Sequence, residues 1–104
     1  MRTEIKLPGI ANCPIKDIVY IEGKGNYSLV HLATKKEVYI AKTLKKFESH
    51  FRMHKFIRIH KSYLVNQENI PSIGTSNFTH IATSLGNRLP ISRRKLAYVR
   101  QKLS

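Results

Sequence analysis

Three short segments near the start of the chain carry β-branched and aromatic residues with a period of two, and this pattern limits the fold more than any other feature. The segments cover residues 18–21, 27–32 and 37–40. Because successive side chains of a β-strand point to opposite faces, the pattern predicts strands. Turn-forming residues at 23–26 and 33–36 separate them. We therefore expect an antiparallel meander.

The first residues of the chain are expected to stand apart from the main domain. Residues 3–7 alternate as well, and Pro8 and Gly9 follow as a stop signal, which is typical of an edge strand. A chain of 104 residues has the size of one domain. We assign residues 1–14 to an N-terminal extension or edge strand and residues 15–104 to the domain.

The rest of the chain predicts two helices and further short strands. Apolar residues recur at three- and four-residue steps from Lys42 onward, which predicts an amphipathic helix of about three turns. A closing helix is expected after Ser92 as its N-cap, with an apolar stripe formed by Leu96, Val99 and Leu103. The short strands are expected at 56–59, 70–73, 78–82 and 89–91, with turns at 74–77 and 85–88 and a structured connection at 60–66. The predicted fold is mainly β with two short α-helices.

The charge of the chain points to a polyanionic partner. Nineteen Lys and Arg stand against six Asp and Glu, a formal net charge of +13, and no acidic residue follows Glu68. Such an imbalance costs self-repulsion unless a polyanion compensates for it. Nucleic acid is the leading partner, a membrane surface is a weaker one, and a merely solubilising surface is the alternative.

Enzymatic, metal-binding and membrane roles lack the residues they need. Apart from Asp17 the acids are five scattered glutamates, without a nucleophile signature or a phosphate-binding glycine loop. His50, His54 and His60 lack a carboxylate or thiolate at metal-ligand spacing. We therefore expect no enzyme, no cofactor and no small-molecule substrate. Without a signal peptide or an apolar run of about 20 residues, we expect a cytoplasmic protein whose single Cys13 is buried or half-buried.

Several polar and aromatic residues are expected to serve the structure. The side chain of Asn66 is expected to hydrogen bond backbone groups in a tight connection. Four tyrosines lie in apolar settings and are expected in the core, where they would not stack on single-stranded nucleic acid. They are Tyr20, Tyr27, Tyr39 and Tyr63.

The middle of the chain resembles a known family. Residues 56–66, with the sequence FIRIHKSYLVN, and the following Ile70 are similar to the signature of the LytTR DNA-binding domains. Other family-like marks appear in order: IVYIE at 18–22 with GNY at 25–27, the approach to the first helix at 41–44, and LPISRR at 89–94. The resemblance covers residues 15–103.

The resemblance implies an elongated arrangement of small antiparallel β-sheets whose loops insert into successive major grooves of double-stranded DNA. It also implies a bacterial transcription regulator, the output domain of a response regulator in a two-component system. The positions that match the family's DNA contacts are Lys24, Asn26, His60, Lys61, Ser62, Arg93 and Arg94.

The chemistry of these residues suggests individual roles. Arg93 is our best candidate for a base reader, because a guanidinium group can donate two hydrogen bonds to guanine. Arg94 is expected to hold phosphate; the alternative for both arginines is a merely structural place in the last helix. Lys61 stands where relatives often carry arginine or asparagine, so it reads a base or neutralises phosphate. Asn26 pairs with adenine or only forms a turn.

Alternatives to sequence-specific DNA binding stay open from the sequence. The basic charge also fits an RNA-binding protein, although the chain has no aromatic RNP-type motif, or a basic protein-interaction module. A regulatory protein and a second copy on paired DNA sites are further expected partners. The chain is either a stand-alone regulator or a piece of a longer one.

Overall fold

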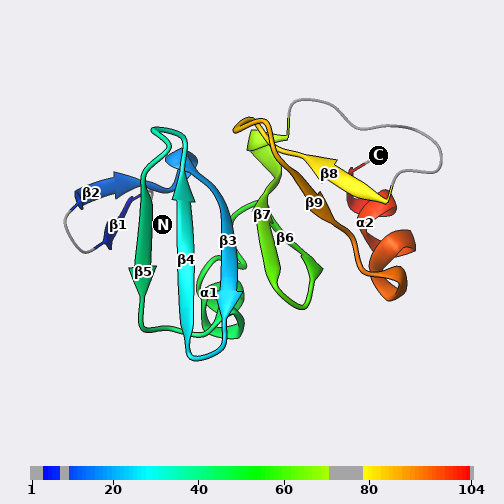
Figure 1. The fold of residues 1–104 in the computed structure, drawn as a ribbon, viewed down its shortest axis with the longest axis horizontal. Coiled ribbons are helices and arrows are strands. Elements are labelled where there is room, and N and C mark those ends of the chain that lie inside the picture. Colours follow the sequence, from blue (N-terminus) through cyan, green and yellow to red (C-terminus); the bar gives the residue numbers. More distant parts are fainter. Residues whose placement is uncertain (1–3, 8–9, 71–78, 104) are drawn as a thin grey trace.

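The computed structural model describes residues 4–7, 10–70 and 79–103, and its centre is a five-stranded antiparallel sheet (Figure 1). The strands lie in the order β5-β4-β3-β7-β6. Their bounds are β3 Ile18–Lys24, β4 Tyr27–Leu32, β5 Glu37–Ile40, β6 Phe56–His60 and β7 Tyr63–Asn66. The predicted meander is therefore confirmed, with β3 extending three residues further than expected because it pairs with β4 down to Lys24.

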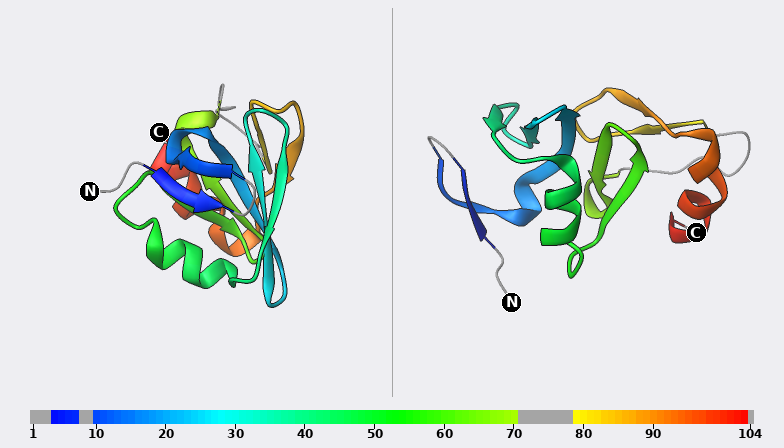
Figure 2. Two further views of the ribbon diagram at one scale, coloured as in Figure 1. Left: turned by 90° about the vertical axis from the view of Figure 1, so that its left-hand side faces the viewer. Right: turned by 90° about the horizontal axis from the view of Figure 1, so that it is seen from below.

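Two small hairpins and two helices complete the described fold. The hairpins are β1 Glu4–Leu7 with β2 Ile10–Pro14, and β8 His80–Ala82 with β9 Arg88–Pro90. The helices are α1 Leu44–His50 and α2 Leu96–Leu103, with short 3-10 turns η1 Ile15–Asp17, η2 Gln67–Asn69 and η3 Arg93–Lys95. The molecule measures 40 × 26 × 25 Å, and Figure 2 shows α1 and α2 at different places along its length. The mainly β, two-helix, elongated fold is as predicted.

The connection expected at 60–66 was wrong, because its second half is a strand. β7 pairs with β3 on one side and with β6 on the other. Leu64 packs in one hydrophobic cluster and Val65 in the other, so both faces of the strand are buried. A strand that is apolar on both faces does not alternate, which is why the period-two pattern missed it.

Helix α1 is shorter than predicted. It begins at Leu44, because the Thr43 side chain accepts a hydrogen bond from the backbone N–H of Lys46 and so caps the helix. It has seven residues, which is two turns where about three were expected. Phe51 follows the helix as its C-cap and stays buried.

Other predicted elements shift by a few residues or fall outside the description. The edge strand predicted at 3–7 is present as β1, but its partner β2 was not predicted. The strands expected at 78–82 and 89–91 are present as β8 and β9. Ile70 is not in a strand; positions 71–73 and the turn at 74–77 lie outside the described residues.

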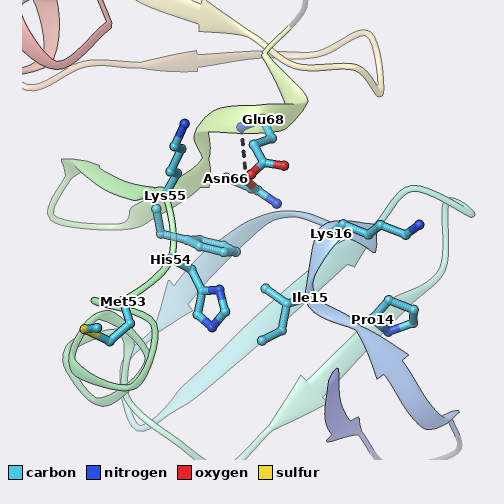
Figure 3. Close-up of a pocket in the computed structure, with 9 residues that line it drawn as sticks. Pro14, Ile15, Lys16, Met53, His54, Lys55, Asn66 and Glu68 are labelled. Atoms are coloured by element: carbon cyan, nitrogen blue, oxygen red, sulfur yellow. Dashed lines mark hydrogen bonds between the residues drawn. The ribbon is translucent and has the colours of Figure 1, made fainter. Parts of the chain in front are cut away.

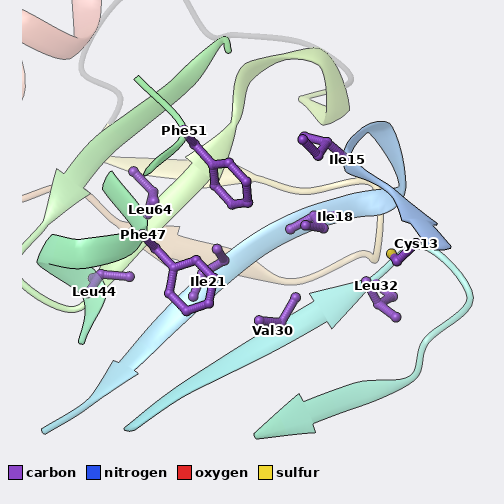
Figure 4. Packing of buried hydrophobic residues seen from close by; sticks show 10 residues of the cluster. All are labelled: Cys13, Ile15, Ile18, Ile21, Val30, Leu32, Leu44, Phe47, Phe51 and Leu64. Carbon is purple, nitrogen blue, oxygen red and sulfur yellow. The ribbon is translucent and has the colours of Figure 1, made fainter. Parts of the chain in front are cut away.

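The core has two clusters, one on each face of the central sheet. Helix α1 packs its apolar residues on the first, as Figure 4 shows, and α2 with β8 and β9 packs on the second. Ile21 and Leu64 belong to the first cluster, and their neighbours Tyr20 and Val65 to the second. Cys13 is buried in the first cluster, as expected.

The tyrosine prediction holds for only two of the four residues. Tyr20 is buried and Tyr63 is half-buried against the second cluster. Tyr27 and Tyr39 are 54% and 63% exposed. They were expected in the core and are not, because the buried residues that the described central sheet gives to the second cluster come from β3, β6 and β7 and not from β4 or β5.

Candidate nucleic-acid interface

Three segments that are distant in the sequence meet along one edge of the molecule, the lower edge in Figure 1. They are the β3–β4 turn, the β6–β7 turn and the η3 segment before α2. The backbone N–H of Gly23 donates to the carbonyl of Ser62 at 2.8 Å, and that of Ser92 donates to the carbonyl of Ile59 at 2.9 Å. The structure thus brings all three predicted groups of site residues to the same edge.

The β3–β4 turn presents Lys24 and Asn26 to solvent. Gly25 has a φ of +70°, a left-handed conformation that glycine adopts without strain. The Lys24 ammonium lies 3.2 Å from the carboxylate of Glu22, whose hydrogen bond raises the pKa of Lys24. Tyr27, the first residue of β4, pairs with Lys24 of β3 and is exposed. Sequence reasoning assigned Tyr27 to the core and so missed it as a surface group at this edge.

The β6–β7 turn holds His60, Lys61 and Ser62. The backbone N–H of Ser62 donates to Nδ1 of His60 at 3.0 Å. Since Nδ1 is the acceptor, a neutral His60 carries its ring proton on Nε2 and can donate it outward. Lys61, at the tip, is exposed.

Arg58 is a second residue that sequence reasoning missed, although it lies inside the family-like motif. Its guanidinium donates from Nε to the carbonyl of His60 at 2.9 Å and from Nη2 to the carbonyl of Lys61 at 2.7 Å. Its Nη1 donates to Oε1 of Glu48, in helix α1, at 2.7 Å. The signal available in the sequence was an arginine three residues before the predicted contact Lys61.

The η3 segment carries the last predicted group. Ser92 precedes η3 as its N-cap, but its side chain makes no capping hydrogen bond. Our prediction of Ser92 as the cap of the closing helix was therefore wrong in part, because a 3-10 turn comes between Ser92 and α2. Arg93 and Arg94 in this turn are both exposed.

A groove of about 430 Å³ joins the second and third segments. It is lined by Glu48, Arg58, His60, Lys61, Ser92, Arg94 and Lys95. Arg94 thus shares the groove with His60 and Lys61, whereas Arg93 is not part of its lining. Within the described parts of the chain, the side chains of Lys61 and Arg94 form no hydrogen bond or ion pair with the protein. The groove therefore offers uncompensated positive charge.

A larger groove, of about 600 Å³, lies away from this edge between η1 and the segment that follows α1 (Figure 3). Asn66 lines it, but its amide is used within the protein. Nδ2 donates to the carbonyl of Ile18 at 2.9 Å, and Oδ1 accepts from the backbone N–H of Glu68 at 3.0 Å. The predicted structural role of Asn66 is confirmed.

Two further features concern metal binding and membrane insertion. No cluster of three or more His, Cys, Asp or Glu side chains suited to a metal ion is found among the residues placed in the structure. Among the same residues, no helix has the length and apolar character needed to cross a membrane.

The fold and the edge define a class of protein: a small, mainly β-domain that presents basic loops along one edge. Comparison with family models makes the class specific, because the LytTr DNA-binding domain model matches residues 9–104. The chain belongs to this family, and its membership supports DNA binding and transcription regulation.

The solved structures agree. The LytTr DNA-binding domain of a putative methyl-accepting/DNA response regulator from Bacillus cereus matches with a TM-score of 0.78 and 25% sequence identity. The match covers 99% of this chain and 95% of that one. A search of curated proteins found no match.

Proposed function

We propose that this domain recognises specific sequences in double-stranded DNA and regulates bacterial transcription as the output domain of a response regulator in the cytoplasm, without catalysing a reaction. The observation that carries the proposal is the gathering of the three basic segments on one edge, with Lys61 and Arg94 uncompensated in a shared groove. Duplex DNA, with about one negative charge per 1.7 Å of axis, is a matching partner.

The family resemblance implies contact with successive major grooves. The elongated shape of the molecule, 40 × 26 × 25 Å, suits a footprint that runs along the DNA. The segments follow one another along the long axis in Figure 1, from the β3–β4 turn through the β6–β7 turn to η3. We therefore propose that the outer segments enter adjacent grooves and that the β6–β7 turn lies between them.

Within this arrangement, the two arginines compete for the base-reading role. Arg93 remains our candidate from the sequence, and Arg94 gains support from its place in the groove beside His60 and Lys61. Either side chain can form the two-pronged contact with guanine O6 and N7. If an arginine reads a base, its substitution by alanine should reduce the domain's discrimination between sequences by about 1–3 kcal/mol. Substitution of the other arginine should weaken binding to all duplexes alike.

Lys61 and Lys24 are proposed phosphate contacts. Because Lys61 has no counter-ion in the described structure, Lys61→Ala should make the negative slope of log K against log salt concentration shallower by about 0.9. Lys24 is paired with Glu22 at 3.2 Å, so it should contribute less than Lys61. Asn26 and Ser62 are proposed as shorter polar contacts from the same turns.

The test is a fluorescence-anisotropy titration of duplexes selected from a random pool, against scrambled duplexes, across about 50–300 mM salt. We expect binding to the selected duplex to persist at the upper salt concentration where scrambled DNA is released. Equal binding to both, lost together with salt, would refute sequence-specific recognition and favour RNA or an acidic protein as the partner.

We also propose that two copies occupy paired DNA sites while the free domain is a monomer. Multi-angle light scattering should give a monomer mass alone and two copies on a duplex with two sites. A stable dimer without DNA would contradict this part of the proposal.

A further inference from the structure

We propose that Arg58 is a positioning residue, anchored by Glu48, that holds the β6–β7 turn in the conformation that DNA binding requires. The inference rests on the proposed function, in which that turn contacts DNA. It assigns Arg58 and Glu48 a part in recognition although neither is proposed to touch the duplex.

The hydrogen bonds of Arg58 span three parts of the fold. The residue itself is in β6, its Nε and Nη2 donate to the carbonyls of His60 and Lys61, and its Nη1 donates to Glu48 in α1. The three distances are 2.7–2.9 Å, the range of strong charge-assisted bonds. A rigid planar fork with donors on several sides can satisfy these acceptors at once, and a lysine cannot.

Other hydrogen bonds also hold the β6–β7 turn. The N–H of Ser62 donates to His60, and its carbonyl accepts from Gly23. Together with Arg58, these contacts use backbone groups on both sides of the Lys61 side chain. The tip is thus ordered before DNA arrives, and binding need not pay for ordering it, which raises affinity.

Arg58 is poorly placed to bind phosphate itself. Its side chain is only 19% exposed, and at least three of its five N–H donors are engaged. The ion pair with Glu48 also cancels its charge locally. Glu48 lines the basic groove, where a carboxylate alone would repel DNA, so its place there is explained by the bond to Arg58.

The direction in which Glu48→Ala changes DNA affinity tests the proposal. Glu48→Ala removes a negative charge from the groove, and electrostatics alone would strengthen DNA binding. If Glu48 anchors Arg58, the variant should instead bind the selected duplex about threefold to tenfold more weakly, the cost of one lost hydrogen bond to a half-exposed partner. The matched control is Glu68→Ala, an equal charge change beside the distant groove, which should not weaken binding. Stronger binding by Glu48→Ala than by Glu68→Ala would overturn the proposal.

A second variant keeps the charge and removes the fork. Arg58→Lys should bind the selected duplex about tenfold more weakly, with the salt slope of the unmodified domain. Lys61→Ala, by contrast, should lower that slope. Unchanged affinity of folded Arg58→Lys would count against a positioning role. If Arg58→Lys does not fold, as judged by circular dichroism, the decision rests on Glu48→Ala.

A DNA-free measurement separates this inference from the proposed function. Amide hydrogen exchange of Ser62 should be faster in Arg58→Lys and in Glu48→Ala, while that of Val65 in the centre of β7 should not change. Faster exchange together with a failure of the parent domain to discriminate duplexes would refute the proposed function but retain the clamp on the turn. Unchanged exchange at Ser62 would refute the clamp itself.

Discussion

The carbonyl of Ile18 provides a quantitative test of how the central sheet is held to the segment after β7. Ile18 has no exposed surface. Its carbonyl accepts from Nδ2 of Asn66 at 2.9 Å and from Nδ2 of Asn69 at 3.2 Å. Two side-chain amides therefore share one buried acceptor, and the consequence of removing either depends on whether the other remains.

The single substitutions should be moderate. Asn66→Ala removes the bond to Ile18 and the bond from the N–H of Glu68, so at about 1 kcal/mol per bond the unfolding free energy should fall by about 2 kcal/mol. Asn69→Ala removes a longer bond to Ile18 and an exposed bond to the carbonyl of Lys16, and should cost about 1 kcal/mol. In each single variant the Ile18 carbonyl keeps one amide donor.

The double variant should cost more than the sum. Without Asn66 and Asn69, the buried carbonyl of Ile18 loses both side-chain donors, and an unsatisfied buried acceptor costs about 1–3 kcal/mol. We therefore expect a loss of about 4–6 kcal/mol where simple addition gives about 3 kcal/mol.

Urea unfolding followed by far-ultraviolet circular dichroism measures these differences, provided that the m-value is the same for all variants. A control cycle combines Asn66→Ala with Thr43→Ala, which share no hydrogen-bond partner and should be additive. If the Asn66 and Asn69 pair is additive within about 0.5 kcal/mol, the shared carbonyl does not couple the two residues and the reasoning fails.

Three other substitutions test the surrounding structure by the same unfolding assay. Thr43→Ala should cost about 1 kcal/mol by uncapping α1, and Thr43→Ser should restore most of it; equal stability of the two variants would exclude a capping role. Tyr20→Phe should cost about 1 kcal/mol at pH 7, because the amide of Asn87 loses the phenol oxygen that accepts its hydrogen bond at 2.8 Å. Burial raises the pKa of Tyr20, so this advantage of tyrosine should be complete below about pH 10 and disappear as the pH rises further; a constant difference would disagree. Tyr39→Ala should change the unfolding free energy by less than about 0.5 kcal/mol, because the side chain is 63% exposed. A loss of several kcal/mol would show that Tyr39 is part of the core.

The sequence predicted β5 best, because this edge strand has a one-sided environment in which exposed and half-buried residues alternate. β4 is buried at five of its six residues, and it was predicted because turn-forming residues mark both of its ends. β7 was missed because the two hydrophobic clusters bury both of its faces, one through Leu64 and the other through Val65. Exposure of Tyr27 and Tyr39 was missed for a related reason: the residues that would cover a strand come from distant parts of the chain, and a local pattern does not contain them.

The candidate site was also predicted only in part from the sequence. The contact residues were predicted from motifs that resemble a family, and the structure places their three segments on one edge. The role of Arg58 could not be found, since only the folded β6–β7 turn brings the carbonyls of His60 and Lys61 to its guanidinium, and Glu48 comes from helix α1. Hydrogen-bond partners across a fold are a property of the fold.

Arg93 and Arg94 show most clearly what the sequence does not predict. They are adjacent residues of the same type, so their chemistry does not distinguish the role of one from that of the other. In a 3-10 turn with about three residues per turn, adjacent side chains point about 120° apart. Only one of the two can therefore face a given groove, and in the structure it is Arg94 that joins His60 and Lys61 there. If the groove receives the phosphate backbone, Arg94 is the phosphate contact and Arg93 remains directed elsewhere, available to a base. If the groove receives a base edge, the roles are exchanged. The selective loss of discrimination in one alanine variant and the uniform loss in the other decides between these two orientations of the domain on DNA.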